Sequence, residues 1–306
     1  MTLSIICPLY KGEKYIESLN ESLLNQKDVD IEEILYIVTE TNGDNSIEKL
    51  NKIKASYKVI LPEEFSHSLT REKAAYEAKG DIIVFISQDI VIKDDKWLYN
   101  LVIDIISGIC DAAFSKQICT NNTIERYTRM KNYPDKSRIA SKDTIKDFGI
   151  MSYFYSDASS AIRKDVFMKL KGYDNKDLLT NEDMYIAYKL INNGYKIKYC
   201  ADSKVIHSHK YSYKTLFKRY FDQGVFLKQH PYIYESGANN GAISLVKFVF
   251  SRAMKEKNLM ALVDIVPNFG VRFIANKIGY KYKRLSENKI LKYTSNKNYW
   301  IRNRKS

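Results

Sequence analysis

Short apolar runs alternate with amphipathic stretches along the first ninety residues. Residues 3–9 form a short apolar run, and residues 13–25 then repeat leucine and isoleucine at helical spacing. Residues 33–38 and 46–57 repeat this order of strand and helix, with a polar loop between them. A further helix is expected at 69–79, which a glycine follows directly. The pattern is that of repeated strand and helix units.

The segment 81–89, DIIVFISQD, contains five consecutive apolar residues, which suits a strand covered on both faces. Together with the preceding units it predicts an α/β fold with a parallel, doubly wound sheet. Ligands of such sheets bind at the carboxyl ends of the strands, so we expect the site in the loops at 8–12, 39–45 and 87–90. The sequence contains neither GxGxxG nor GxxxxGK[ST], which argues against a dinucleotide-dependent dehydrogenase and a P-loop NTPase.

The composition is that of a folded protein. The 306 residues are 45% apolar and 13% aromatic, enough to bury a core in one large or two ordinary domains. No run approaches the roughly 20 uninterrupted apolar residues of a membrane span, and the N-terminus lacks a signal-peptide pattern, so we expect a cytosolic chain. Four separated cysteines without a CxxC pair indicate core residues, not disulfides or zinc ligands: Cys7, Cys110, Cys119 and Cys200.

The formal net charge of +13 is unevenly distributed. Residues 1–203 carry 28 Lys/Arg against 31 Asp/Glu, whereas residues 204–306 carry 21 against 5. The last third of the chain is therefore suited to phosphate groups or anionic surfaces.

Two groups of carboxylates are candidates for chemistry. Asp89 ends an apolar strand, where its carboxylate could hold a divalent cation that bridges a nucleotide diphosphate, or simply begin a turn. Glu182 and Asp183 precede an amphipathic helix, where they could be catalytic acids, but Thr180 and Asp183 also have the spacing of a helix cap.

Basic and imidazole groups give two further candidates. His207 and His209 lie on the same face of an extended segment and could bind a metal ion, although chance alternation in a solvated strand is equally simple. Arg71 lies near the start of the expected third helix, where it could bind phosphate or cover the edge of the sheet.

In their order along the chain, these stretches resemble family-2 glycosyltransferases, and more narrowly their bacterial rhamnosyltransferase branch. The matching stretches span nearly the whole chain and read SIICPLYKGEKYI, FSHSLTREKAAYEAKGDIIVFISQD, NEDMYIAYKLINNGYKIKY, VIHSHKYSYKTLFKRYFDQG and IGYKYKRL. The resemblance implies a GT-A fold, a Rossmann-like and mostly parallel sheet flanked by helices, with a C-terminal helical extension. It divides the chain into a nucleotide-sugar-binding catalytic domain at 1–210 and a basic, aromatic helical region at 211–306.

The resemblance also implies roles for residues that follow the first two strands. Pro8 and Tyr10 match the pocket for the nucleotide base, and Asp44 lies in the second nucleotide-binding loop. In that loop, Thr39 or Glu40 stands where the family usually has an aspartate that accepts a hydrogen bond from the base. The identity of the base is therefore left open.

The remaining donor-side residues are implied in the same way. The tripeptide Ser-Gln-Asp that ends at Asp89 replaces the Asp-x-Asp of the family, as it does in the rhamnosyltransferase branch. Gln88, Asp89 and Arg71 are assigned to the nucleotide sugar, and Asp89 also to a divalent cation, Mg²⁺ or Mn²⁺. His207 matches a histidine that completes the metal shell in relatives, and His209 is a candidate substitute.

The implied activity is inverting transfer of a sugar to a hydroxyl of a glycan. The pair Glu182 and Asp183 matches the acidic pair of the family, in which the aspartate is the usual general base. The branch implies L-rhamnose from dTDP-rhamnose, with glucose, galactose or galactofuranose as alternatives and a nucleotidyltransferase as a more distant one. The implied acceptor belongs to a cell-surface polysaccharide pathway and is linked to a polyprenyl diphosphate.

The basic tail is the last feature that a function must explain. Residues 211–227 form a helical pattern with one aromatic face that we expect to close over the acceptor side. The apolar stretches 243–254 and 259–266, an interruption at Pro267, and the mixed stretch 271–285 suit the surface of an anionic membrane, so the protein is expected to be peripheral on the inner face of the cell membrane. The alternatives are helices that pack on the catalytic domain, and a nucleic-acid-binding tail, which nothing in the front part supports.

Overall fold

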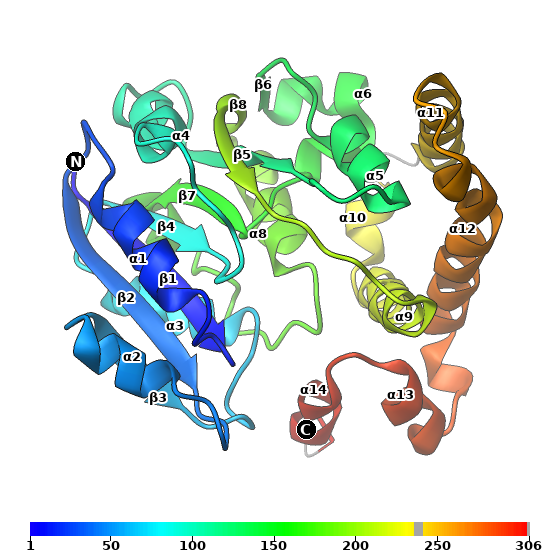
Figure 1. The fold of residues 1–306 in the computed structure, drawn as a ribbon, viewed down its shortest axis with the longest axis horizontal. Coiled ribbons are helices and arrows are strands. Elements are labelled where there is room, and N and C mark those ends of the chain that lie inside the picture. Colours follow the sequence, from blue (N-terminus) through cyan, green and yellow to red (C-terminus); the bar gives the residue numbers. More distant parts are fainter. Residues whose placement is uncertain (236–240, 305–306) are drawn as a thin grey trace.

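The computed structural model describes residues 1–235 and 241–304, and its centre is one eight-stranded sheet (Figure 1). The strand order is β3-β2-β1-β4-β7-β5-β8-β6. Neighbouring strands are parallel except where β7 pairs with β4 and β5 and where β6 pairs with β8. The strands are β1 (Leu3–Tyr10), β2 (Ile31–Thr39), β3 (Ser56–Ile60), β4 (Ile82–Ile86), β5 (Ala112–Ile118), β6 (Arg138–Ala140), β7 (Ser159–Arg163) and β8 (Ile197–Ile206).

Helices cover both faces of this sheet. Apolar residues of α1, α2 and α4 form the core on one face, and those of α3, α7 and α8 form the core on the other. The helices before residue 213 are α1 (Ile16–Leu24), α2 (Ser46–Lys52), α3 (Leu69–Glu77), α4 (Trp97–Ile106), α5 (Ile124–Asn132), α6 (Ile145–Phe148), α7 (Lys164–Lys169) and α8 (Glu182–Asn192). The expected α/β fold with a mostly parallel sheet is confirmed.

The central strand β4 shows why the pattern predicted a doubly covered sheet. All five of its residues are buried. Ile83 and Phe85 belong to the core on one face, while Ile82, Val84 and Ile86 belong to the core on the other. The four cysteines are free and buried, as expected.

The predicted helix over 46–57 was too long. Helix α2 ends at Lys52, Lys54 adopts a left-handed conformation with φ of 54°, and the chain then forms the edge strand β3. Because β3 lies at the edge of the sheet and all five of its residues are exposed or half-buried, its sequence carries little apolar alternation. The antiparallel strand β7 was not predicted either.

The chain after β8 forms helices that lie beside one end of the sheet (Figure 1). The expected helices at 211–227 and 243–254 correspond to the first and third of them. These helices are α9 (Tyr213–Gln229), α10 (Pro231–Glu235), α11 (Gly241–Lys255), α12 (Leu259–Tyr280), α13 (Glu287–Tyr293) and α14 (Lys297–Arg302).

The expected interruption at Pro267 was wrong, because α12 continues through the proline. Side chains one turn apart bridge this region. Asn268 Nδ2 donates to Asp264 Oδ2 at 3.1 Å, and Arg272 Nε donates to Asn268 Oδ1 at 2.8 Å. Arg272 Nη1 also donates to the Tyr220 hydroxyl at 2.9 Å, which ties α12 to α9. This ladder supports the helix where proline removes a backbone donor.

By length and composition alone, α12 could cross a membrane, and 22% of its most apolar window is buried. The sequence reading found no such segment because Asp264 and Arg272 interrupt the apolar run. Arg272 is buried against α9, and its charge is paired with Glu125 at 3.8 Å between Nη2 and Oε2. Part of the helix is therefore held on the protein.

Gly224 on α9 and Gly279 on α12 allow these two helices to pack with their backbones in close contact. A Cβ atom at Gly279 would lie 2.0 Å from the Phe221 carbonyl oxygen, whereas one at Gly270 would have nothing within 4 Å. We expect Gly279→Ala to lower the free energy of unfolding by about 1–3 kcal/mol, and the matched Gly270→Ala to raise it by about 0.5–1 kcal/mol. Urea unfolding of both variants checks this. Equal effects would contradict the close helix crossing.

Candidate functional site

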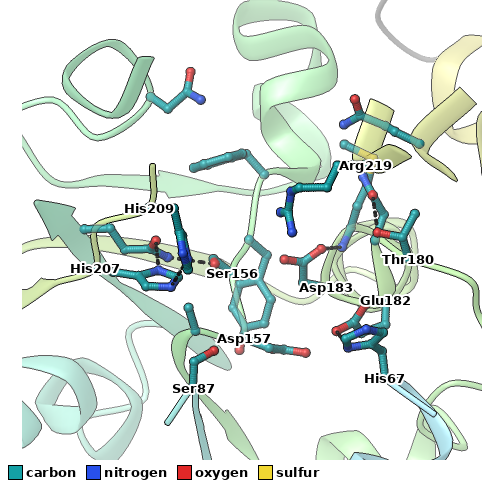
Figure 2. A pocket seen from close by; sticks show the side chains of 18 of the residues that line it. His67, Ser87, Ser156, Asp157, Thr180, Glu182, Asp183, His207, His209 and Arg219 are labelled. Atoms are coloured by element: carbon teal, nitrogen blue, oxygen red, sulfur yellow. Dashed lines mark hydrogen bonds and ion pairs between the residues drawn. The ribbon is translucent and has the colours of Figure 1, made fainter. Parts of the chain in front are cut away.

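A cavity of about 550 Å³ opens at the carboxyl ends of β4, β5 and β8. The start of α8 and one side of α9 close it, which agrees with the expected position of the aromatic helix. Asp89, Asp183 and His207 all line this one cavity. Figure 2 shows His207 and His209 on one side, Glu182 and Asp183 on the other, and Asp157 between them.

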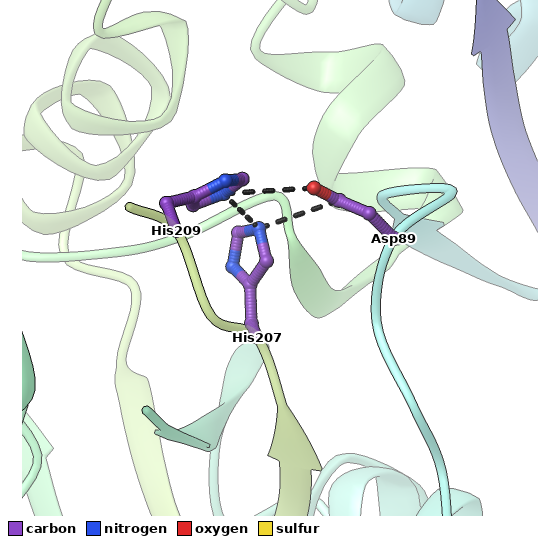
Figure 3. Close-up of side chains that lie close together, drawn as sticks. All are labelled: Asp89, His207 and His209. Atoms are coloured by element: carbon purple, nitrogen blue, oxygen red, sulfur yellow. Dashed lines mark hydrogen bonds and ion pairs between the residues drawn. The ribbon is translucent and has the colours of Figure 1, made fainter. Parts of the chain in front are cut away.

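Asp89, His207 and His209 converge on one point of the cavity (Figure 3). His207 Nε2 lies 3.3 Å from Asp89 Oδ1, and His209 Nε2 lies 3.6 Å from Asp89 Oδ2. The two Nε2 atoms are 2.7 Å apart. Two ring nitrogens at this distance need a proton or a cation between them, and two imidazoles with a carboxylate are a ligand set that suits a divalent transition metal.

A short backbone contact brings this trio together. The loop after β4 and the end of β8 pair through Val91 and Ile206, with N···O distances of 2.8 and 2.9 Å. Asp89 lies two residues before Val91, and His207 directly follows Ile206. Residues more than a hundred positions apart thus face the same point.

Gln117, near the end of β5, determines which ring nitrogen of His207 carries the hydrogen. Its Oε1 lies 2.9 Å from His207 Nδ1, and it also accepts a hydrogen bond from Arg129. Since a guanidinium only donates, this atom is the amide oxygen, and Nδ1 of His207 must carry the hydrogen. The lone pair of His207 Nε2 therefore faces Asp89 and His209, as a metal ligand requires.

The surroundings of Asp89 and His209 favour the protonation states in which these side chains can bind a metal ion. Burial alone would raise the pKa of Asp89, but the neighbouring imidazoles of His207 and His209 outweigh it and lower that pKa. Burial, followed by the charge of His207, lowers the pKa of His209 to about 4. At neutral pH, Asp89 is ionised and His209 is neutral.

Across the cavity, Arg71 holds the side chain of Glu182. Arg71 Nη1 lies 3.3 Å from Glu182 Oε1 and donates to the His67 carbonyl oxygen at 2.8 Å. His67 Nδ1 lies 3.9 Å from the same carboxylate oxygen. Arg71 lines the cavity, but its guanidinium is paired with Glu182. It therefore holds the side chain of Glu182 in place.

Asp183 is half-buried and points its carboxylate into the cavity. Its Oδ1 accepts a hydrogen bond from the backbone N–H of Met184 at 2.7 Å. Burial, followed by the negative charges of Glu182 and Asp157, raises the pKa of Asp183 well above its usual value. A carboxylate with a raised pKa is a stronger base than an exposed one.

The helix cap expected at Thr180 is not formed. The N-cap of α8 is Asn181, which has a left-handed φ of 59° and no capping side-chain bond, and the Thr180 hydroxyl donates to the Asn181 side chain instead. The acidic pair therefore lies on the first turn of the helix, where the dipole favours negative charge.

Asp157 is a further buried carboxylate, for which no role was predicted. The Ser160 hydroxyl donates to Oδ1 and the Tyr173 hydroxyl to Oδ2, each at 2.9 Å. Burial is the main cause that raises the pKa of Asp157 to about 6, with Glu182 adding to it and Arg71 opposing it. The carboxylates of Asp157, Glu182 and Asp183 thus all lie around the buried guanidinium of Arg71.

Five residues predicted to bind the nucleotide do not line the cavity: Pro8, Tyr10, Glu40, Asp44 and Gln88. They lie at the same edge of the sheet, since Tyr10 is the register partner of Thr39 at the ends of β1 and β2. Tyr10 N donates to Gln88 Oε1 at 2.8 Å, and Gln88 Nε2 donates to the Tyr10 carbonyl at 2.9 Å. Gln88 therefore connects the first loop to the one that carries Asp89.

The second predicted loop is linked to the first in a similar way. The Ser46 hydroxyl donates to Asp44 Oδ1 at 2.8 Å and accepts from the N–H of Gly12 at 3.1 Å. Of the two residues in the expected base-binding position, Thr39 is buried and Glu40 is exposed. Glu40 is thus the accessible one.

Sequence reasoning missed several polar residues of the cavity. Gln117, Arg129 and Arg219 contribute to it from β5, α5 and α9. Arg219 packs on the ring of Tyr211, with 4.9 Å from its Cζ to the ring centre, and forms no ion pair among residues 1–235 and 241–304. None of these residues has a spacing that marks it as functional.

Comparisons with known proteins agree with this architecture. The family model described as glycosyl transferase family 2 matches residues 4–171. The O-antigen chain rhamnosyltransferase RfbN of Salmonella typhimurium is 28% identical over 306 residues, 98% of this chain and 96% of the relative. The O-antigen chain rhamnosyltransferase WbaN of Salmonella anatum is 30% identical over 271 residues, 87% of this chain and 85% of the relative.

Solved structures share the fold at lower identity. Mannosyltransferase PcManGT from Pyrobaculum calidifontis, solved with GDP-Man and Mn²⁺, has a TM-score of 0.58 at 13% identity, covering 92% of this chain and 88% of its own. TarS 1–349 of S. aureus, solved with UDP-GlcNAc, has a TM-score of 0.52 at 15% identity, covering 94% and 93%. The sheet, the cavity and these matches together show that the chain is a glycosyltransferase with a GT-A fold and belongs to glycosyl transferase family 2.

Proposed function

We propose that the protein is an inverting rhamnosyltransferase that transfers L-rhamnose from dTDP-rhamnose to a hydroxyl of a lipid-linked O-antigen-type glycan. The observation that carries the mechanism is the arrangement of the cavity, with a metal-ligand trio on one side and a free basic carboxylate on the other. Support for rhamnose comes from the two relatives, which are O-antigen chain rhamnosyltransferases similar to this chain over most of its length.

The donor side of the cavity stabilises the leaving group. Asp89, His207 and His209 would hold a divalent cation, Mg²⁺ or Mn²⁺, which when bound supplies Lewis-acid stabilisation of a nucleoside diphosphate. Arg219, whose charge is not neutralised by a carboxylate of the described residues, is positioned on the wall of the same cavity to bind a diphosphate oxygen. Tyr10, which is hydrogen-bonded to Gln88, and Glu40 bind the nucleoside at the neighbouring loops.

The acceptor side removes a proton. Asp183 accepts the hydrogen of the attacking hydroxyl, while Arg71 and His67 hold Glu182 away from that hydroxyl. Because the base and the leaving group lie on opposite sides of the cavity, the hydroxyl attacks the anomeric carbon from the face opposite the diphosphate. A single displacement of this kind inverts the anomeric configuration.

A donor screen tests the proposed substrate. Thermal melts with Mn²⁺ are measured in the presence of dTDP-rhamnose, dTDP-glucose, UDP-glucose, UDP-galactose, UDP-galactofuranose and GDP-mannose. We expect dTDP-rhamnose to raise the melting temperature most, because a ligand that binds only the folded state stabilises it by mass action. If another nucleotide sugar stabilised the protein more, that sugar would replace rhamnose as the proposed donor. Analysis of the reaction products separates the remaining alternative, because a nucleotidyltransferase would release pyrophosphate instead of dTDP.

The role of Gln117 in orienting His207 gives a separate prediction. We expect Gln117→Leu to weaken Mn²⁺ binding in the presence of dTDP by about 10–100-fold, because the hydrogen of His207 Nδ1 loses its acceptor. Gln117→Glu keeps an oxygen in that position and should retain most of the affinity. Calorimetric titration of Mn²⁺ measures both variants. An equal loss in both would show that the hydrogen bond does not orient the ligand.

We also propose that α11 and α12 bind an anionic membrane surface, which brings the cavity to a lipid-linked acceptor. The outward face of α12 carries large apolar side chains that are 73–79% exposed: Leu259, Met260, Val263 and Val266. The surrounding segment 204–306 carries 21 Lys/Arg against 5 Asp/Glu. Apolar insertion combined with basic charge is the pattern of interfacial helices on anionic lipid.

Sedimentation with vesicles tests this surface. We expect Val263→Glu combined with Val266→Glu to lower the partition coefficient onto phosphatidylglycerol vesicles by about tenfold or more, because two apolar side chains no longer enter the lipid. A matched pair elsewhere, Leu24→Glu on α1 with Met168→Glu on α7, replaces two exposed side chains outside these helices and should bind as the wild type does. Binding that is equal for all three proteins, or equal on neutral vesicles, would refute the membrane surface.

A further inference from the structure

A second cavity, of about 560 Å³, lies between α5, α11 and the end of β5. Five basic side chains line it against one acidic side chain, Asp135. Their elements meet here because α11 packs on α5 through a small apolar core that includes Ile124 and Val249. The basic residues are Lys116, Arg126, Arg129, Lys131 and Arg252.

Three of these charges are already neutralised within the protein. Lys116 pairs with Asp135, Arg126 pairs with Glu256 at 2.7 Å between Nη1 and Oε2, and Arg129 pairs with Glu125 at 3.1 Å between Nε and Oε1. The last two basic residues, one on each wall, have no carboxylate partner in the part of the chain that is described. They are Lys131 on α5 and Arg252 on α11.

Lys131 and Arg252 share an aromatic support. Both cations lie over the ring of Phe248, Lys131 Nζ at 5.4 Å and Arg252 Cζ at 5.6 Å from its centre. Phe248 thus holds two unneutralised positive charges close to each other, an arrangement that suits a ligand with two negative oxygens or two phosphates. The pKa of Asp135 is lowered by its hydrogen bond to Lys116 and the charge of Lys116, and further by Lys204 and Arg252, which reflects the positive potential of this cavity.

The second cavity adjoins the catalytic cavity, and one of the helices that line it also has exposed apolar residues. It shares Gln117, Arg129 and Tyr133 with the catalytic cavity, so the two cavities adjoin along these side chains. Helix α11, which lines this cavity with Phe248 and Arg252, also carries the exposed apolar residues Phe250 and Met254. A ligand bound here would have sugars on the side of Asp183 and an apolar chain on the side of the membrane-facing helices.

We propose that this second cavity binds the diphosphate of the lipid-linked acceptor, with Lys131 and Arg252 as its principal ligands. The proposal rests on the proposed transferase function, because it identifies the acceptor as a saccharide linked through a diphosphate to an isoprenoid-type chain. It also explains why basic charge is concentrated beside the apolar helices. The diphosphate anchors the acceptor, and the saccharide extends past Arg129 into the catalytic cavity.

Binding of farnesyl diphosphate to the full chain tests the proposal, with farnesol, inorganic pyrophosphate and phosphatidylglycerol vesicles as comparisons. We expect Lys131→Gln combined with Arg252→Gln to weaken farnesyl diphosphate by about tenfold or more, since two charge-assisted bonds are lost. Lys289→Gln with Lys292→Gln removes the same charge from the exposed helix α13 and should change the affinity by less than about twofold. Pyrophosphate should compete for the site, and farnesol should not.

Several results would overturn the assignment. One is that the double variant binds farnesyl diphosphate as tightly as the wild type does, and another is that farnesol binds as tightly as farnesyl diphosphate. Displacement of farnesyl diphosphate by dTDP with Mn²⁺ would place it in the donor site instead. If Lys131 and Arg252 mattered only for binding to phosphatidylglycerol vesicles, the ligand would be a lipid headgroup. Binding of dTDP with Mn²⁺ is measured on the same proteins. If all variants bind dTDP equally and the substitutions do not change the affinity for farnesyl diphosphate, the proposed acceptor site is wrong and the transferase proposal stands. If no variant binds dTDP, the transferase proposal fails on its own.

Discussion

Replacement of Asp183 by asparagine should lower the turnover of dTDP-rhamnose by about 10²–10⁴-fold, the usual contribution of a positioned general base. The amide keeps the size of the side chain and can still accept from the Met184 N–H, but it cannot take the proton of the attacking hydroxyl. Binding of dTDP with Mn²⁺ should stay within about twofold of the wild type, because Asp183 lies across the cavity from the metal-ligand trio. Steady-state kinetics and calorimetry measure the two effects.

Glu182, the neighbour of Asp183, provides a second test, because its replacement should change the pKa of the base without removing the base. The negative charge of Glu182 raises the pKa of Asp183, so Glu182→Gln should lower that pKa. Activity depends on ionised Asp183 and is lost as pH falls through its pKa, so the acidic limb of the kcat/KM profile should move to lower pH in this variant. Asp143→Asn, an exposed carboxylate outside the cavity, should leave rate and profile unchanged. Wild-type turnover in Asp183→Asn would remove it as the base.

Loss of the metal-ligand trio should have an effect of similar size. Asp89→Ala removes the carboxylate that joins both imidazoles, and we expect kcat/KM to fall by about 10³-fold, equivalent to several kcal/mol of leaving-group stabilisation. Mn²⁺ binding in the presence of dTDP should be lost in calorimetry. Asp202→Ala, on the exposed side of β8, is the matched control and should bind Mn²⁺ normally. Activity that survives both Asp89→Ala and thorough chelation would exclude this role of the trio.

The part of the fold up to residue 89 could be predicted because β1, β2, β4 and the helices between them carry strong local patterns, whereas the elements from α4 to α7 were not predicted. Five consecutive apolar residues are explained only by burial on both faces, which is where the structure places them. The edge strand β3 and the short antiparallel strand β7 could not be predicted, because an edge strand needs little apolar sequence and SSAIR has none of the length or pattern of a central strand. Pro267 was misread because the side-chain ladder through Asn268 depends on contacts with α9.

The site was predicted only in part, for a similar reason. Asp89, His207 and Asp183 could be proposed from their order in the family pattern, but their convergence depends on the backbone pairing of Val91 with Ile206. Gln117, which orients His207, is an ordinary strand residue whose role appears only when the strands are side by side. The nucleotide-binding loops stay a prediction.

Crystals grown with dTDP and Mn²⁺ would locate the metal ion through its anomalous signal. We expect one Mn²⁺ within ligand distance of Asp89 and His207, with the diphosphate of dTDP on that ion and Asp183 facing it across an open space large enough for a sugar. A diphosphate bound elsewhere, or a metal ion held away from Asp89 and His207, would show that the cavity does not work as proposed.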